Sequence, residues 1–201
     1  PWKISFHPRT GDLWVGDVGW ELWEMVYRVE KGGNYGWSVM EGPMPTNAYQ
    51  KIGPNPITPP TATYDHSKGA SITGGYFVTS NRLPGLQDSY VYGDYVTGKV
   101  WALEWDGEKV VSNREIADTR QDIVTFGQDA SGDVLFLELA PNVSLQRFVV
   151  NSDRNRSISF PMRLSETGIF SDVSNQLASP GVYEFEINTP MWQDGHESDY
   201  W

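Results

Sequence analysis

The sequence contains no cysteine among its 201 residues, which excludes disulfides, zinc–thiolate sites and cysteine nucleophiles. It also lacks a run of roughly 18 apolar residues, so it predicts no membrane-spanning helix. Positive charge is scarce, because 15 Lys+Arg stand against 26 Asp+Glu and give a formal net charge of −11. This balance argues against a nucleic-acid-binding surface and against attachment to an anionic membrane.

Aromatic residues and turn-forming residues are abundant. Nine Trp, ten Tyr and eight Phe accompany 20 Gly and 13 Pro. Aromatic side chains favour strands, whereas glycine and proline mark turns. No long stretch repeats apolar residues at helical spacing. The composition therefore predicts an all-β fold made of many short strands.

A strand–turn–strand pattern occurs three times, over residues 5–19, 85–110 and 124–140. Within it, the segment Tyr90–Asp94 (YVYGD) resembles the segment Leu13–Asp17 (LWVGD). Repeats of roughly 40–50 residues, each a small antiparallel sheet, are typical of β-propeller blades. A β-sandwich with chance similarity would give the same pattern. A propeller ring needs at least about four blades. Because the pattern accounts for only about three, it predicts that this chain forms part of a larger ring.

The composition changes after residue 150. Residues 151–159 are polar and have no core-forming pattern, and strand-like alternation returns at 183–188. We therefore expect a propeller part over 1–150, and a linker with the start of an appended module over 151–201. Both ends of the chain are abrupt, which indicates an excerpt from a longer protein.

Several phrases resemble the soluble quinoprotein glucose/sorbosone dehydrogenase family. The most specific is KGGNYGW at 31–37, which follows DVGWELWE at 17–24; the phrases YVYGDYVTGKVWAL from Tyr90 and FGQDASGDVLFLEL from Phe126 follow in order. The resemblance covers residues 1–149. It implies a partial six-bladed β-propeller of about three blades with a short C-terminal extension. It also implies pyrroloquinoline quinone (PQQ), calcium, a sugar or aldose substrate, an unidentified electron acceptor, and a periplasmic or extracellular location.

The resemblance also implies site residues. Gly19 lies in the loop whose backbone carbonyls hold the PQQ-bound calcium, and Arg120 matches one of two arginines that clamp the PQQ carboxylates. Glu24 and the main-chain oxygen of Tyr35 fall where the family places a structural calcium; a solvated acidic face fits the same acidic residues equally well. The family's general-base histidine lies upstream of this chain. We therefore expect no catalytic residue here, and no activity from the 201 residues alone.

Four positions differ from the family's pattern, and one of them is Val18, which replaces a polar residue before Gly19. Trp20 replaces a proline after Gly19, Val96 replaces a lysine that contacts PQQ, and Asp122 replaces the second clamp arginine. An aspartate repels an anionic cofactor. These differences favour an alternative function, in which the chain is a non-catalytic propeller module that binds carbohydrate or protein, as in propellers of the hedgehog-interacting-protein type.

The tryptophans and histidines complete the set of candidates. Most tryptophans are expected to pack between blades, while Trp20 and Trp23 are the best candidates for a sugar-stacking platform. The glycine-rich turn at 32–37 is expected to place Trp37 in the core. The three histidines, His7, His66 and His196, have no metal-ligand spacing and are expected at the surface or in turns.

Overall fold

The computed structural model of the protein describes residues 1–46, 49–141, 143–150, 170–172 and 177–178. The chain divides into two compact units, Pro1–Val150 and Asn151–Trp201. In the second unit, the strands β14 (Phe170–Asp172) and β15 (Leu177–Ala178) pair antiparallel. The rest of the expected linker and appended module lies outside the described residues, and that division of the chain stays a prediction.

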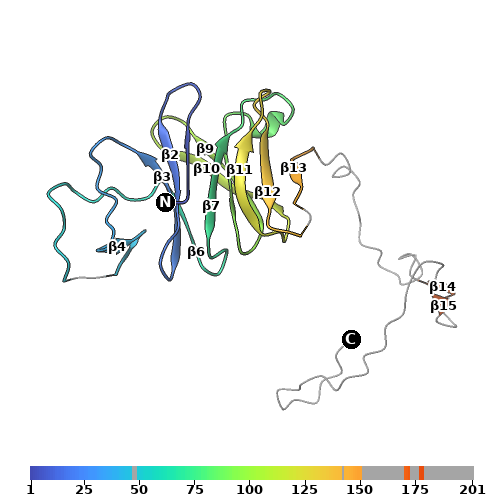
Figure 1. The fold of residues 1–201 in the computed structure, drawn as a ribbon, viewed down its shortest axis with the longest axis horizontal. Helices are drawn as coiled ribbons and strands as arrows, with labels where there is room; N and C mark the ends of the chain where they lie inside the picture. The colour runs from blue at the N-terminus through green and yellow to red at the C-terminus, as the bar shows by residue number, and fades with distance from the viewer. Residues whose placement is uncertain (47–48, 142, 151–169, 173–176, 179–201) are drawn as a thin grey trace, which may run out of the picture. The chain divides into compact units, whose positions relative to one another are not determined.

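The first sheet contains four antiparallel strands in the order β1-β2-β3-β6 (Figure 1). These strands are β1 (Lys3–Phe6), β2 (Leu13–Asp17), β3 (Trp23–Val29) and β6 (Ala62–Asp65). A long connection between β3 and β6 carries the two-residue strands β4 (Met40–Glu41) and β5 (Met44–Pro45). The turn between β1 and β2 contains Gly11 at φ +74°, a conformation that favours glycine.

The second and third sheets repeat this design. One has the order β10-β9-β8-β7 and the other the order β11-β12-β13. Their strands are β7 (Ile72–Phe77), β8 (Tyr90–Asp94), β9 (Lys99–Trp105), β10 (Val110–Asp118), β11 (Ile123–Gln128), β12 (Val134–Glu138) and β13 (Leu145–Arg147). Among the described residues, the single helix is the 3-10 turn η1 (Pro84–Leu86), and no helix is long and apolar enough to cross a membrane.

The three sheets converge on their first strands. Strand β7 contacts β1, β2 and β11, and Figure 1 shows it between β2 and β11. Lys3 Nζ, on β1, donates to Thr125 Oγ1, on β11, at 3.0 Å. Sheets that meet along their inner strands and diverge outward are blades of a propeller. The predicted all-β fold with about three propeller blades is therefore confirmed.

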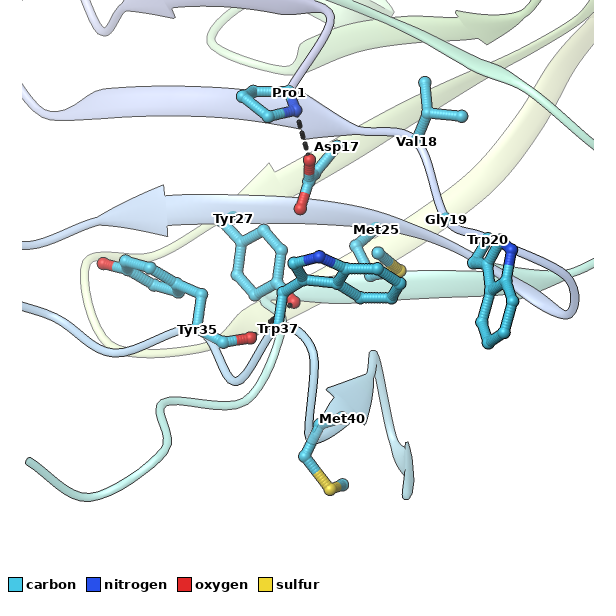
Figure 2. Close-up of a pocket in the computed structure, with 10 residues that line it drawn as sticks. All are labelled: Pro1, Asp17, Val18, Gly19, Trp20, Met25, Tyr27, Tyr35, Trp37 and Met40. Carbon is cyan, nitrogen blue, oxygen red and sulfur yellow. Dashed lines mark hydrogen bonds and ion pairs between the residues drawn. The ribbon is translucent and has the colours of Figure 1, made fainter. Parts of the chain in front are cut away.

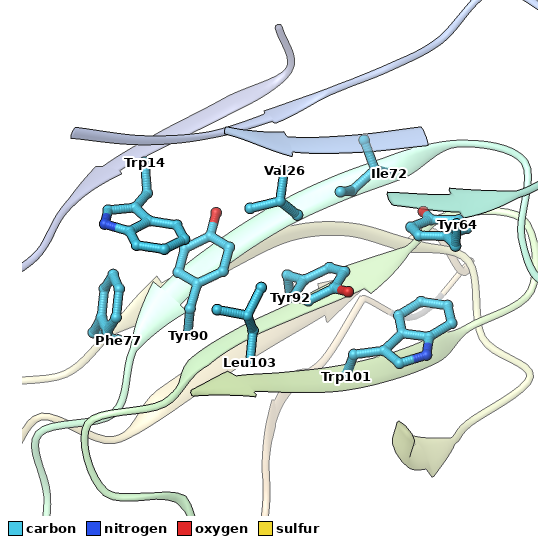
Figure 3. Close-up of a cluster of buried hydrophobic side chains, with 9 residues drawn as sticks. All are labelled: Trp14, Val26, Tyr64, Ile72, Phe77, Tyr90, Tyr92, Trp101 and Leu103. Atoms are coloured by element: carbon cyan, nitrogen blue, oxygen red, sulfur yellow. The ribbon is translucent and has the colours of Figure 1, made fainter. Parts of the chain in front are cut away.

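An aromatic cluster fills the space between the first and second blades (Figure 3). Trp14 is fully buried, and its ring centroid lies 5.2 Å from that of Phe77 and 5.4 Å from that of Tyr90. Tyr64 stacks on Trp101 at 4.8 Å. Burying such large side chains dominates the energetics of a small core. Trp14 and Trp101 pack between blades, as the composition predicted.

Candidate functional site

The connections at one edge of the blades form a continuous face. The β10–β11, β8–β9 and β6–β7 connections and the β2–β3 loop follow one another along this edge. Hydrogen bonds join the neighbours: Thr119 N to Gly98 O at 3.0 Å, Tyr95 N to Ser71 O at 2.7 Å, and Ile72 N to Glu24 Oε2 at 2.7 Å. We call this edge the upper face. It carries both the loop that contains Gly19 and the turn that contains Arg120.

A hollow of about 310 Å³ opens beside the β2–β3 loop (Figure 2). Trp20 and Trp37 stand edge to face there, with ring centroids 6.1 Å apart and planes at 81°. They are 64% and 65% exposed. Tyr27 and Tyr35 form a second perpendicular pair at 4.8 Å. We call this space the Trp20 hollow; its lining is Pro1, Asp17, Val18, Gly19, Trp20, Met25, Tyr27, Tyr35, Trp37 and Met40.

A buried carboxylate holds the wall of this hollow in place. Glu41 Oε1 accepts hydrogen bonds from four successive backbone N–H groups, those of Trp20, Glu21, Leu22 and Trp23, at 3.0, 2.9, 2.8 and 3.0 Å. Glu41 is only 2% exposed. Burial alone would raise its pKa, but the four N–H donors together hold the pKa below its usual value. The N–H groups of this loop therefore point inward, onto a fixed negative charge.

A second buried carboxylate ties the loop to the next blade. Glu24 Oε2 accepts from Ile72 N at 2.7 Å, and Oε1 lies 3.3 Å from Gly19 N and 3.0 Å from His66 Nε2. Glu24 is fully buried. Burial raises its pKa, against the hydrogen bonds from Ile72, His66 and Gly19, which lower it. His66 is thus not a simple surface residue, because it pairs with this carboxylate.

Comparison with known proteins places this arrangement in a family. The model of a family described as glucose/sorbosone dehydrogenase matches residues 1–147. The chain belongs to the glucose/sorbosone dehydrogenase family. It is 40% identical over 116 residues to the HIPL1 protein of Arabidopsis thaliana and 36% identical over 114 residues to the HIPL2 protein of that plant. Each match covers 51% of this chain and 16% of the relative, so the chain spans a small part of these relatives.

Solved structures of sugar dehydrogenases share the fold. A glucose dehydrogenase superposes with a TM-score of 0.61 at 22% identity, covering 72% of this chain and 43% of that one. The soluble aldose sugar dehydrogenase of Escherichia coli, in its apo-form, gives a TM-score of 0.57 at 20% identity, covering 71% and 42%. The three blades described above therefore correspond to less than half of such a propeller.

The residues that the family resemblance singles out do not form one cluster: Gly19 and Arg120 lie in connections of the upper face, Glu24 is a buried residue of β3, and Tyr35 lies in the β3–β6 connection. Gly19 and Tyr35 line the Trp20 hollow, and Glu24 Oε1 accepts a hydrogen bond from Gly19 N. Arg120 is exposed at φ +54° in the β10–β11 turn and does not line that hollow. In the described part of the chain, no group of three or more His, Cys, Asp or Glu side chains is arranged to hold a metal ion. The cofactor and calcium roles of these residues stay predictions.

The expectation that Trp37 lies in the core is wrong, and the role of Glu41 is not predicted from the sequence. Trp37 is not in the core, because Gly36 takes the buried position of the turn at φ +89°, where a Cβ would lie 2.9 Å from Met40 Cβ. Glu41 was not recognised from the sequence at all. It lies in a long connection without periodicity, 18 to 21 residues from the N–H groups that it accepts. Only its position before Gly42, in an otherwise Pro- and Gly-rich segment, sets it apart.

The raised pKa of Glu24 predicts a pH-dependent stability. Because the folded state binds this proton more tightly than the unfolded state, where the pKa is near 4.5, the stabilisation is present below that pH. It is lost as the pH rises through the pKa of the folded state. The unfolding free energy of the wild type minus that of Glu24→Gln should therefore fall as the pH rises above about 4.5. Urea unfolding between pH 4 and 8 measures it.

The control for this experiment is Glu21→Gln, which changes an exposed acid of the same loop. The unfolding free energy of the wild type minus that of Glu21→Gln should stay nearly constant over the same pH range. If the Glu24→Gln difference is equally flat, or rises with pH, burial does not dominate the titration of Glu24.

Proposed function

We propose that the chain is part of a sugar dehydrogenase-like protein and that its Trp20 hollow binds the sugar or aldose. The observation that carries this proposal is the exposed, perpendicular pair Trp20 and Trp37 at the rim of the hollow. A contiguous patch of exposed apolar surface marks a ligand-binding groove or another interaction site. Their faces offer a sugar ring a wide apolar contact at low entropic cost, while hydroxyl groups stay available for hydrogen bonds.

The β2–β3 loop has backbone carbonyl oxygens that suit a calcium ion. Its N–H groups are committed to Glu41 and Glu24. Among the described residues, no hydrogen-bond donor reaches the carbonyl oxygens of Gly19, Trp20 and Glu21. Calcium prefers hard oxygen ligands such as these. We propose that Gly19 presents its carbonyl to a calcium ion; Glu24 and the carbonyl of Tyr35 remain the second proposed calcium position.

The residues of this chain do not by themselves fit PQQ, whose carboxylates need cationic partners. Arg120 is available on the upper face, but Val96 has no charge and Asp122 is negative. Lys99 is the lysine nearest to Val96 in the sequence, and it is paired with Glu115, with 3.6 Å between Nζ and Oε2. Oxidation of a sugar hydroxyl with transfer of electrons to PQQ is therefore proposed for the longer protein only, with Arg120 as this chain's contribution. A periplasmic or extracellular location is part of the same proposal.

A second candidate function is a non-catalytic propeller that binds carbohydrate or protein. The uncharged Val96 and the acidic Asp122, where the family resemblance expects cations, favour it. Both candidates share the Trp20 hollow as a binding site. They differ in whether the full-length protein reduces a dye in the presence of PQQ and an aldose.

The test uses the full-length protein with the substitutions Trp20→Ala and Trp37→Ala. Each should weaken binding of an aldose such as glucose by about 10-fold, because the sugar loses an aromatic contact. Isothermal titration measures the affinity. The matched control is Trp2→Ala, since Trp2 is 65% exposed and does not line this hollow. Unchanged affinity in both hollow variants would refute sugar binding at this site.

Dye reduction by the same preparations separates the two candidates. PQQ-dependent turnover with glucose by the full-length protein supports the dehydrogenase, and sugar binding without turnover supports the non-catalytic module. The 201-residue chain alone should give no turnover, because the family resemblance places the general-base histidine upstream of it.

A further inference from the structure

Two blades carry an aspartate at the same position and use it differently. Asp17 ends β2, and Asp94 ends β8, the second strand of the next blade. Asp94 is fully buried and satisfied: Oδ1 accepts from Val96 N at 3.0 Å and Thr97 N at 2.9 Å, and Oδ2 from Tyr64 Oη at 2.8 Å and Ser71 N at 2.7 Å. In the second blade, this aspartate therefore holds its own turn and the start of the inner strand.

In the first blade, a different carboxylate holds the turn after the second strand. Glu41 takes the N–H groups of the turn after β2, as Asp94 does for the turn after β8. Glu24 accepts from Ile72 N at the start of β7, which is the inner strand of the second blade and not of the first. Asp17 therefore differs from Asp94 in that it does not hold the turn that follows its own strand.

The side chain of Asp17 faces the Trp20 hollow (Figure 2). It is 26% exposed, and its Oδ1 lies 2.5 Å from the amino nitrogen of Pro1. Within the described residues, Oδ2 accepts no hydrogen bond. In any protein in which a residue precedes Pro1, this nitrogen is an amide without a hydrogen and cannot donate to Asp17. The carboxylate stands close enough to Tyr27 that, after burial, its charge raises the pKa of that phenol.

We infer that Asp17 is a specificity-determining residue that accepts hydrogen bonds from two adjacent hydroxyl groups of a sugar packed against Trp20 or Trp37. This inference rests on the proposed function. A carboxylate has two oxygens and only accepts, so it matches a vicinal diol. Hydrogen bonds to a charged acceptor are stronger than neutral ones. A site built in this way rejects sugars that lack one of the hydroxyls far more strongly than an apolar wall can.

The experiment compares Asp17→Asn with the wild type in the full-length protein, by isothermal titration with glucose and its 2-, 3- and 4-deoxy analogues. Asp17→Asn should weaken glucose binding by about 10-fold or more, since charge-assisted hydrogen bonds are lost. In the wild type, removal of either hydroxyl of one adjacent pair should cost a similar factor. In Asp17→Asn the same analogues should bind nearly as well as glucose itself does to that variant, because the carboxylate that accepts from these hydroxyls is already absent. Glu21→Gln, an exposed acid outside the hollow, is the matched control and should behave as the wild type.

The outcomes separate this inference from the function on which it rests. If the wild type binds glucose but Asp17→Asn binds it equally well, or loses the same factor with every deoxy analogue as the wild type, Asp17 does not select the sugar and the binding site stands. If the wild type binds none of the sugars, the proposed function and the inference both fail. The wild-type analogue series is informative even if Asp17→Asn does not fold, since equal affinity for all analogues would by itself overturn the diol contact.

Discussion

Glu41→Ala is expected to lower the free energy of unfolding by about 3 kcal/mol or more, because it leaves four partly buried N–H groups without an acceptor. These groups belong to Trp20–Trp23, which all donate to one carboxylate oxygen. A water molecule cannot replace an acceptor that meets four converging donors at once. Urea unfolding followed by tryptophan fluorescence measures the loss. Sugar affinity should fall as well, because the loop carries Trp20.

The matched substitution is Glu21→Ala, which removes an exposed carboxylate from the same loop and should change stability by less than about 0.5 kcal/mol. The pH dependence gives a second criterion. Since the pKa of Glu41 lies below its usual value near 4.5, its stabilisation is present above that value and is lost as the pH falls through the folded-state pKa. A Glu41→Ala protein as stable as Glu21→Ala would show that the N–H cluster contributes nothing.

Gly19→Ala is expected to displace the β2–β3 loop and abolish sugar binding at the Trp20 hollow. A Cβ at this position would lie 1.6 Å from the carbonyl oxygen of Trp23 and 2.8 Å from Glu41 Oε1. The Trp23 backbone and the buried Glu41 carboxylate leave no room, so the loop itself has to move. We expect a loss of about 2–4 kcal/mol in unfolding free energy, in the upper range for a point substitution, measurable in the same urea experiment.

Gly127→Ala is the control, because a Cβ there meets nothing within 4 Å and the residue lies in the third blade. It should keep both the stability and the sugar affinity of the wild type. If Gly19→Ala binds sugar as tightly as Gly127→Ala, the shape of this loop is irrelevant to the hollow.

The sequence predicts the blades well because strand alternation and turn glycines are local signals. The likeness of the segments Leu13–Asp17 and Tyr90–Asp94 reports a real equivalence, since both are second strands of a blade. Trp14 is predicted to pack between blades because a strand that alternates has one face toward a neighbour. These features depend on residues close together in the chain, so strand alternation and turn residues are enough to predict them.

The site is harder to predict because long connections build it. Glu41 reaches the β2–β3 loop only after the chain has turned back on itself, and no periodicity records that return. Trp37 was assigned to the core from its glycine-rich turn, but the turn buries Gly36 and leaves the indole at the rim. The different roles of Asp17 and Asp94 are likewise invisible in two similar segments that both end in Gly-Asp. They depend on which distant carboxylates satisfy the neighbouring N–H groups.

The most direct test of sugar binding at the Trp20 hollow is a crystal structure of the full-length protein soaked with glucose. The expected density shows a hexose ring against Trp20 or Trp37, with adjacent hydroxyls within hydrogen-bond distance of Asp17. A hexose bound elsewhere on the propeller, with the Trp20 hollow filled by another part of the protein, would contradict the proposed site.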